Sequence, residues 1–153
     1  GRISFAWKTR VESQGNVTPL CHIPGDKIVH NKRKEEFPMP FSEVCIYQVK
    51  PQKAEEFEAL MLEAKGFLER QEGLLLLRFM KRGYHVDMEQ IREGLPPLKL
   101  TRVVKSVKYV LYWEFDTKES YGTAQKNLYG SYWKAIEKCL IVPHDKYLGE
   151  ELF

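Results

Sequence analysis

The sequence predicts an α+β fold of the ferredoxin-like type, an antiparallel sheet with helices on one face. Three observations predict it: the order strand, helix, strand, strand, helix, strand over residues 43–153, a strongly amphipathic first helix, and apolar strands. That order is the split βαβ motif, written βαββαβ. It leaves one sheet face without helices, and an open apolar face needs a cover. We therefore expect a second copy of the chain to supply that cover.

Composition places the chain among ordinary globular domains. Its 153 residues are 43% hydrophobic and 29% charged, with a formal net charge of +3. Lysines and arginines alternate with acids, apart from a short run at 32–34, so we expect no nucleic-acid partner. No apolar run approaches the roughly 18 residues of a membrane span, so we expect no membrane partner.

Three cysteines, Cys21, Cys45 and Cys139, form no CxxC pair. Free cysteines of this kind are usually small buried hydrophobes, which favours a reducing, cytoplasmic location. Cys21 with His22 and His30 matches no recognised ligand spacing, so we expect no metal site.

Residues 1–42 are predicted to form an N-terminal arm that packs on the domain at 43–153 or reaches across to a second subunit. Apolar and polar residues alternate from Ile3 to Val11, which predicts an extra strand. A turn at Gly15-Asn16 and a second run at 17–23 favour a hairpin.

The first half of the domain begins with a strand at 43–50. The helix at 51–72 follows, with Pro51 at its start, Gly73 after its end and one apolar stripe: Phe57, Leu60, Met61, Ala64, Phe67 and Leu68. The next strand, 73–82, is apolar on both faces, which predicts an interior position in the sheet.

The second half contains a long insertion, a strand, a helix and a last strand. The insertion at 83–101 is predicted to hold a short helix near 87–93 and to lie at one end of the sheet. The strand at 103–115 has two apolar faces. Asp116 and Glu119 predict a capping box for the helix at 116–138, and Gly130 predicts a kink in it. The last strand is predicted at 139–148.

These features resemble the antibiotic biosynthesis monooxygenase family of dimeric α+β barrels. The resemblance covers about Glu43 to Leu152. It rests on short motifs: Val44-Cys45-Ile46-Tyr47-Gln48-Val49-Lys50-Pro51, Glu56-Phe57, Gln71-Glu72-Gly73, and Tyr109 to Asp116 with Glu119 and Ser120. Such motifs indicate a fold better than an activity.

The resemblance implies a homodimer and, for an enzyme, oxygenation of a small phenol or quinol without a cofactor. The chain departs from the family's pattern at two positions. Many family members carry a histidine on the second helix, near the place of Gln125 or Lys126, and this helix has none. The haem-degrading branch has an asparagine on its first strand, where this chain offers Gln48, so haem binding or degradation loses support.

Candidate site residues follow from chemistry that suits a phenol. His85 and His144 are the candidate catalytic bases, since an unperturbed imidazole titrates near neutral pH. Four aromatic residues are the candidate substrate-binding set, Tyr112, Trp113, Tyr132 and Trp133. Surface histidines and a packed aromatic core explain the same residues, so a dimer that only binds a ligand or serves a structural role remains the alternative.

Overall fold

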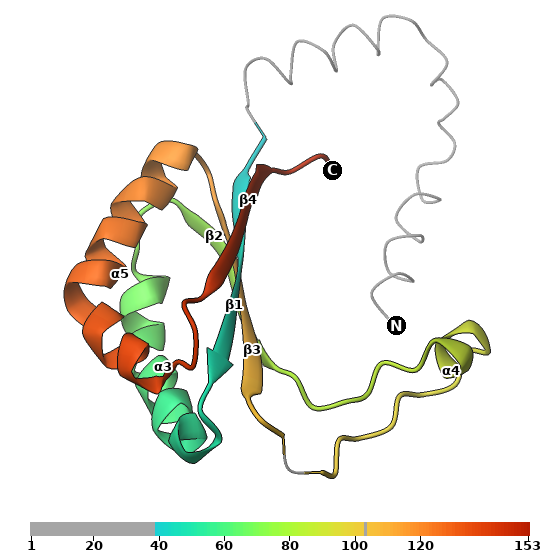
Figure 1. Ribbon diagram of the computed structural model, residues 1–153. Helices are drawn as coiled ribbons and strands as arrows, with labels where there is room; N and C mark the ends of the chain where they lie inside the picture. The colour runs from blue at the N-terminus through green and yellow to red at the C-terminus, as the bar shows by residue number, and fades with distance from the viewer. Residues whose placement is uncertain (1–38, 103) are drawn as a thin grey trace, which may run out of the picture. The chain divides into compact units, whose positions relative to one another are not determined.

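The computed structural model describes residues 39–102 and 104–153, and it confirms the predicted βαββαβ order of the ferredoxin-like fold (Figure 1). Predictions for the N-terminal arm fall on residues 1–38 and lie outside the described residues. In chain order the elements are β1 (Phe41–Val49), η2 (Pro51–Lys53), α3 (Ala54–Glu69), β2 (Leu74–Lys81), α4 (Met88–Arg92), β3 (Val107–Phe115), α5 (Lys118–Cys139) and β4 (Asp145–Glu150).

The sheet is antiparallel with the strand order β2-β3-β1-β4. Cys45 of β1 lies opposite Leu111 of β3, and Leu111 lies opposite Phe79 of β2. The prediction of an interior position for β2 is therefore wrong, because β2 is an edge strand. Strand β2 is apolar on both faces because one face meets the helices and the other belongs to the open side of the sheet.

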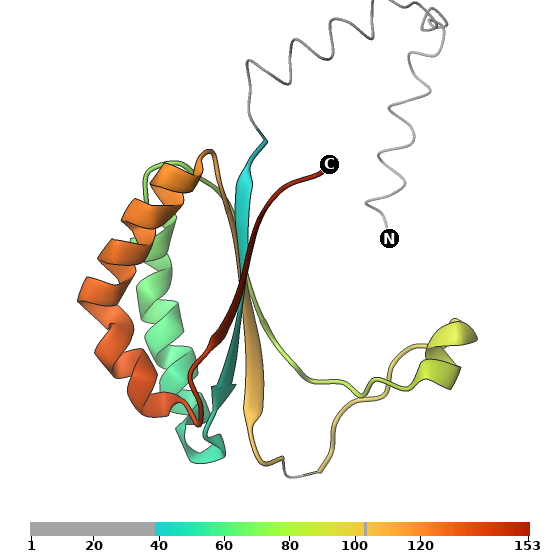
Figure 2. The ribbon, with the colours of Figure 1, turned by 45° about the horizontal axis from the view of Figure 1, so that its top comes forward.

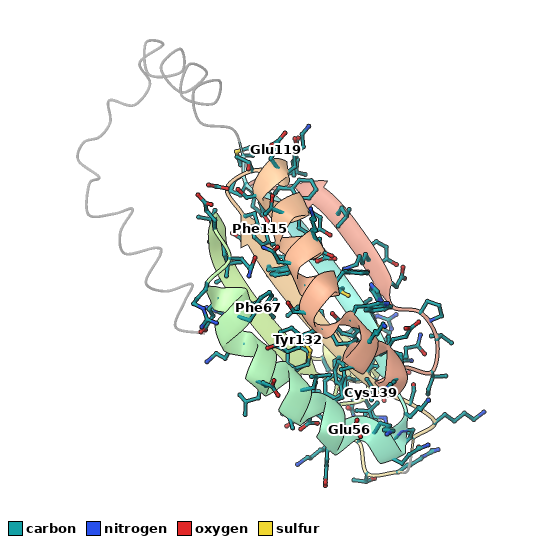
Figure 3. All side chains as sticks on the ribbon, turned by 90° about the vertical axis from the view of Figure 1, so that its left-hand side faces the viewer. Glu56, Phe67, Phe115, Glu119, Tyr132 and Cys139 are labelled. Atoms are coloured by element: carbon teal, nitrogen blue, oxygen red, sulfur yellow. The ribbon has the colours of Figure 1, made fainter. Side chains whose placement is uncertain are left out.

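Both long helices cover the same face of the sheet, as Figures 1 and 2 show. Alternate residues of β1 and β3 point toward them, and these are the buried positions of each strand. Phe67 of α3 and Tyr132 of α5 meet edge to face between the helices, with ring centroids 5.3 Å apart (Figure 3). The core therefore lies between the sheet and the helix pair.

Helix α5 differs from its prediction in its N-cap residue and in its continuity. Thr117, not Asp116, is the N-cap residue, and its side chain accepts a hydrogen bond from the Ser120 backbone N–H. A break near Gly130 does not occur, since the helix is continuous over Lys118–Cys139, and this glycine is exposed. Tertiary packing along the buried stripe of α5 outweighs the low helix propensity of one glycine.

Helix α4 confirms the short helix predicted near 87–93. It belongs to the insertion, which leaves the end of β2 and extends on the side of the sheet opposite the long helices (Figures 1 and 2). Gly83 and Leu100 join its outgoing and returning segments through a 2.9 Å backbone hydrogen bond. Strands β3 and β4 begin later than predicted, at Val107 and Asp145.

Cys45 and Cys139 are free and buried, as expected for small apolar residues. Among the described residues, no helix is both long and apolar enough to cross a membrane.

Candidate functional site

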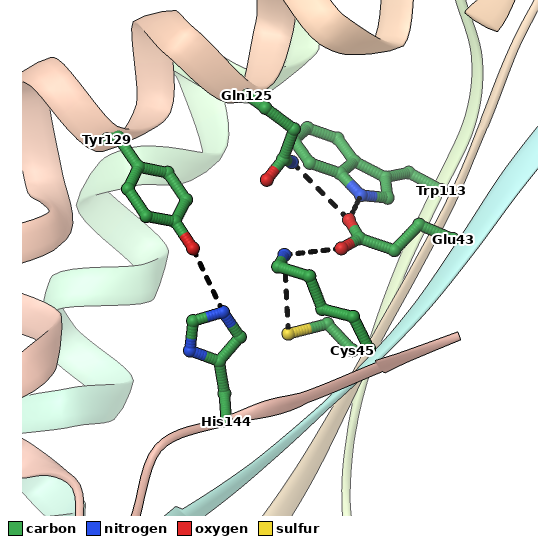
Figure 4. Close-up of polar contacts among 7 residues, drawn as sticks. Glu43, Cys45, Trp113, Gln125, Tyr129 and His144 are labelled. Carbon is green, nitrogen blue, oxygen red and sulfur yellow. Dashed lines mark hydrogen bonds and ion pairs between the residues drawn. The ribbon is translucent and has the colours of Figure 1, made fainter. Parts of the chain in front are cut away.

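A buried carboxylate lies at the centre of the helix-covered side of the sheet. Glu43 on β1 is completely buried, at a position of the strand that otherwise carries core side chains. Its carboxylate accepts hydrogen bonds from Trp113 Nε1, from Lys146 Nζ, and from Gln125 Nε2 at 3.4 Å (Figure 4). Four elements, β1, β3, α5 and β4, therefore converge on one acid.

Lys146 supplies the counter-charge. It lies opposite Cys45 in the β1–β4 ladder, and its side chain is 22% exposed. A buried charge is costly without a partner, so this ion pair and the Trp113 N–H make the position of Glu43 tolerable. Nζ also lies 3.9 Å from Cys45 Sγ, but burial raises the pKa of that thiol to about 11. Cys45 is therefore a protonated thiol near neutral pH and a poor nucleophile.

His144 lies just before β4 and faces helix α5 (Figure 4). Its Nε2 is 3.1 Å from the hydroxyl oxygen of Tyr129, and its ring meets Trp133 edge to face at 4.8 Å. Burial lowers the pKa of His144, and the positive charge of Lys146 lowers it further. The imidazole is therefore neutral near pH 7, the form that accepts a proton.

The second ring nitrogen of His144 lacks a partner. Nδ1 is buried and makes no hydrogen bond to any described residue. A buried polar atom without a partner is uncommon and costs free energy. A substrate hydroxyl that reaches Nδ1 would supply the missing hydrogen bond.

The surroundings of His144 suit an aromatic ligand. Trp133 and Tyr129 stack with ring centroids 5.0 Å apart, and Tyr129 remains 40% exposed. Trp133 also lines a surface hollow of about 240 Å³ with Ile141, Val142 and Pro143. Tyr129 and Trp133 thus place aromatic surface directly beside the histidine.

The structure brings only some of the predicted site residues together. His144 and Trp133 are neighbours, and Trp113 joins the same interior through Glu43. Tyr132 packs instead against Phe67 between the helices.

Tyr112 and His85 lie elsewhere. Tyr112 follows the alternation of β3 onto the open sheet face, opposite in direction to Trp113. His85 is exposed in the insertion, where its backbone N–H donates to Leu98 O at 2.9 Å. The predicted residues therefore do not line a single pocket.

Sequence reasoning missed Glu43, Gln125, Tyr129 and Lys146. Glu43 had a usable signal, because it occupies the same alternating positions as three buried residues of β1, Cys45, Tyr47 and Val49. An acid in that series predicts a buried carboxylate with a partner. Lys146 and Tyr129 had no such signal, since their closeness to the acid and the histidine depends on how β4 and α5 pack.

A second hollow on the helix side is larger and more apolar. It has a volume of about 360 Å³ and lies between α3 and the β2 edge, where Met61, Leu77 and Phe79 line it. Glu58 at its rim accepts hydrogen bonds from Tyr109 Oη at 2.6 Å and from Lys81 at 2.7 Å. No histidine lines it, so its chemistry suits binding rather than proton transfer.

Comparison with solved structures identifies the fold family. A protein from Nitrosomonas europaea, provisionally described as an antibiotic biosynthesis monooxygenase, is 12% identical with a TM-score of 0.55, covering 75% of this chain and 92% of its own. SnoaB from Streptomyces nogalater, described as a cofactor-independent oxygenase, is 15% identical with a TM-score of 0.51 and coverages of 74% and 94%. A conserved protein from Methanosarcina mazei is 16% identical with a TM-score of 0.52, covering 74% and 93%.

The chain has the antibiotic biosynthesis monooxygenase-like fold. No protein-family model matches the chain, and no curated protein matches it. At these identities the likeness establishes the arrangement of helices and strands, and the activity has to be argued from this chain's own residues.

Proposed function

We propose that the chain is a cofactor-independent monooxygenase that acts on a small phenol or quinol beside His144. For a phenol, one substrate molecule and one dioxygen give a quinone and one water. One oxygen atom becomes the new ring carbonyl and the other leaves as water. Carbon therefore loses the four electrons that dioxygen gains, and no external reductant is needed.

His144 is the proton carrier in this proposal. Its neutral imidazole takes the phenol proton, and the electron-rich phenolate passes one electron to dioxygen. The two radicals join at a ring carbon, and the proton held by His144 completes a hydroperoxide. Loss of the ring C–H proton with cleavage of the O–O bond then releases water and leaves the quinone.

The observation that carries the proposal is the imidazole geometry. His144 is held neutral by burial and by Lys146, its Nε2 is fixed by Tyr129, and its Nδ1 has no partner among the described residues. A neutral imidazole with one ring nitrogen that lacks a partner is a suitable acceptor for the phenol proton. The sequence, with no glycine-rich phosphate loop or dinucleotide fingerprint, agrees with chemistry driven by the substrate itself.

Oxygen uptake tests the proposal. Purified protein is assayed with an oxygen electrode across a panel of phenols and quinols, with His144→Gln, Tyr129→Phe and His85→Gln alongside. Loss of the base is expected to lower kcat by about 10²–10⁴-fold in His144→Gln, with His85→Gln unchanged. Equal uptake by His144→Gln and the parent protein would refute the assignment of the base.

The second candidate function is a ligand-binding or structural protein without turnover. The apolar hollow between α3 and β2 favours it, because this hollow is larger than the one beside Trp133 and no histidine of the described part of the chain lines it. Absence of oxygen uptake together with saturable binding of an aromatic ligand would favour this function.

We also propose a homodimer formed through the open sheet face. That face carries Ile46, Val110, Met80 and Tyr147, and the last two are 57% and 60% exposed. Burial of such a patch is a strong driving force for association. The buried free cysteines suit a reducing compartment, so we expect a cytoplasmic protein.

A further inference from the structure

The base of the insertion gathers positive charge from two parts of the sequence. Arg82, Arg102, Lys105 and Lys108 line one depression of about 420 Å³, and among the described residues no aspartate or glutamate lines it. Arg102, Lys105 and Lys108 fall within seven residues of the chain, whereas Arg82 precedes Arg102 by twenty positions. The fold thus adds Arg82 to a group of cations that are already close in the sequence.

Backbone pairing holds these cations together. Arg82 donates its N–H to Lys108 O at 2.9 Å, which extends the β2–β3 pairing by one step beyond the strand. Tyr84 and Lys99 form an isolated antiparallel bridge a little further out. The outgoing and returning segments of the insertion therefore lie side by side at its base.

None of the four cations is neutralised within the described part of the chain. The ion pairs found there involve other lysines, on α3, β2, β4 and η2. Like charges brought into one hollow repel one another and reduce stability. Water screens part of this repulsion, because Arg82, Arg102 and Lys105 are exposed, and a bound anion would relieve the rest.

The other lining groups define the kind of anion. Ser106 and His85 add hydrogen-bonding groups, while Leu100 and Val104 provide apolar surface. A guanidinium group can donate two parallel hydrogen bonds to two oxygens of a phosphate, and this depression offers two such groups. The volume of the depression is in the range of small-molecule sites. A single carboxylate carries too little charge to balance four cations, whereas a phosphate ester or pyrophosphate carries two or more negative charges.

We propose that this depression binds the phosphate or pyrophosphate group of a small molecule. The site is distinct from the cluster around His144, since it lies at the insertion and shares no residue with that cluster. A nucleic acid would need an extended basic surface, and this cluster is one hollow in a chain with a net charge of only +3.

Calorimetric titration with inorganic pyrophosphate tests the site, using the full chain and the variants Arg102→Gln and Arg92→Gln. Arg92 lies on α4 in the same insertion but outside the depression, so its variant makes the same change in net charge. We expect saturable binding that Arg102→Gln weakens at least tenfold and Arg92→Gln weakens less than twofold. Circular dichroism checks that both variants keep the fold.

Three results would overturn the proposal. The first is no binding by the parent protein at low ionic strength. The second is equal weakening by both arginine variants, which would indicate diffuse attraction rather than a site. The third is tighter binding of single-stranded oligonucleotides, with affinity that rises with their length, which would indicate a nucleic-acid surface. Inorganic phosphate, titrated in parallel, distinguishes a monophosphate ligand from a pyrophosphate.

Discussion

Replacement of Lys146 by methionine isolates the energetic role of the buried ion pair. Methionine replaces most of the apolar stem of the lysine and lacks the charge that neutralises Glu43. Glu43 is completely buried and would still accept hydrogen bonds from Trp113 and Gln125. Breaking a buried pair costs about 3–5 kcal/mol, because one charge stays buried without compensation.

The expected loss for Lys146→Met is near the lower end, about 3 kcal/mol, because the lysine side chain is still 22% exposed. At about 3 °C per kcal/mol for a chain of this size, the melting temperature should fall by roughly 9 °C. Urea unfolding at pH 7, followed by tryptophan fluorescence, measures the free energy directly.

Lys81→Met is the matched control. Its Nζ is 2.7 Å from Glu58, but both side chains are roughly half exposed, so we expect a change below about 1 kcal/mol. The double variant Glu43→Gln/Lys146→Met should recover part of the loss, since it removes both charges. If Lys146→Met lowers the free energy of unfolding no more than Lys81→Met does, the buried ion pair does not stabilise the fold.

Three further predictions concern stability, pH and assembly. Gly73 has φ +85°, and a Cβ there would lie 2.5 Å from Asp116 Oδ1, so Gly73→Ala should cost about 2 kcal/mol of unfolding free energy, measured with urea. Gly122 on α5 has open space around it, so Gly122→Ala should stabilise the fold by up to about 1 kcal/mol. Equal effects of the two substitutions would contradict the turn geometry at Gly73. The pKa of His144 in the folded protein is below its usual 6.5, so as the pH falls this imidazole is protonated in the unfolded chain before it is protonated in the folded one. The stability from neutral His144 is therefore complete above about pH 6.5 and is lost below it, and the parent should lose more stability than His144→Gln between pH 7 and pH 5; parallel curves would contradict the pKa shift. Met80→Glu on the open face should shift a sedimenting dimer toward monomer, and a parent protein that sediments as a monomer would refute the interface.

Periodicity predicted most of the fold because the core residues repeat at regular spacing. Phe57, Met61, Ala64 and Leu68 fall on one helix stripe, and all four are buried. The edge position of β2 was not predictable in the same way, since strand order depends on which strands pair and not on any one strand's pattern. The N-cap of α5 was missed by one residue because Asp116 and Thr117 are both good caps, and only packing decides between them.

The candidate site was predicted in part. His144 and Trp133 were identified as chemistry-bearing residues, and the fold places them in contact. Tyr112 was grouped with Trp113 because both are aromatic, although neighbouring residues of a strand face opposite sides. Tyr129, which contacts His144, comes from α5, and Lys146, which lowers its pKa, comes from β4. These residues come together only through the tertiary structure.

The most direct test of the proposed activity is the fate of labelled dioxygen. The protein is incubated with a phenol that supports oxygen uptake under isotopically labelled dioxygen, and the quinone is analysed by mass spectrometry. The mechanism predicts one labelled oxygen atom per quinone, with product formation lost in His144→Gln and kept in His85→Gln. An unlabelled quinone, or labelled product formed equally by His144→Gln, would contradict oxygenation at His144.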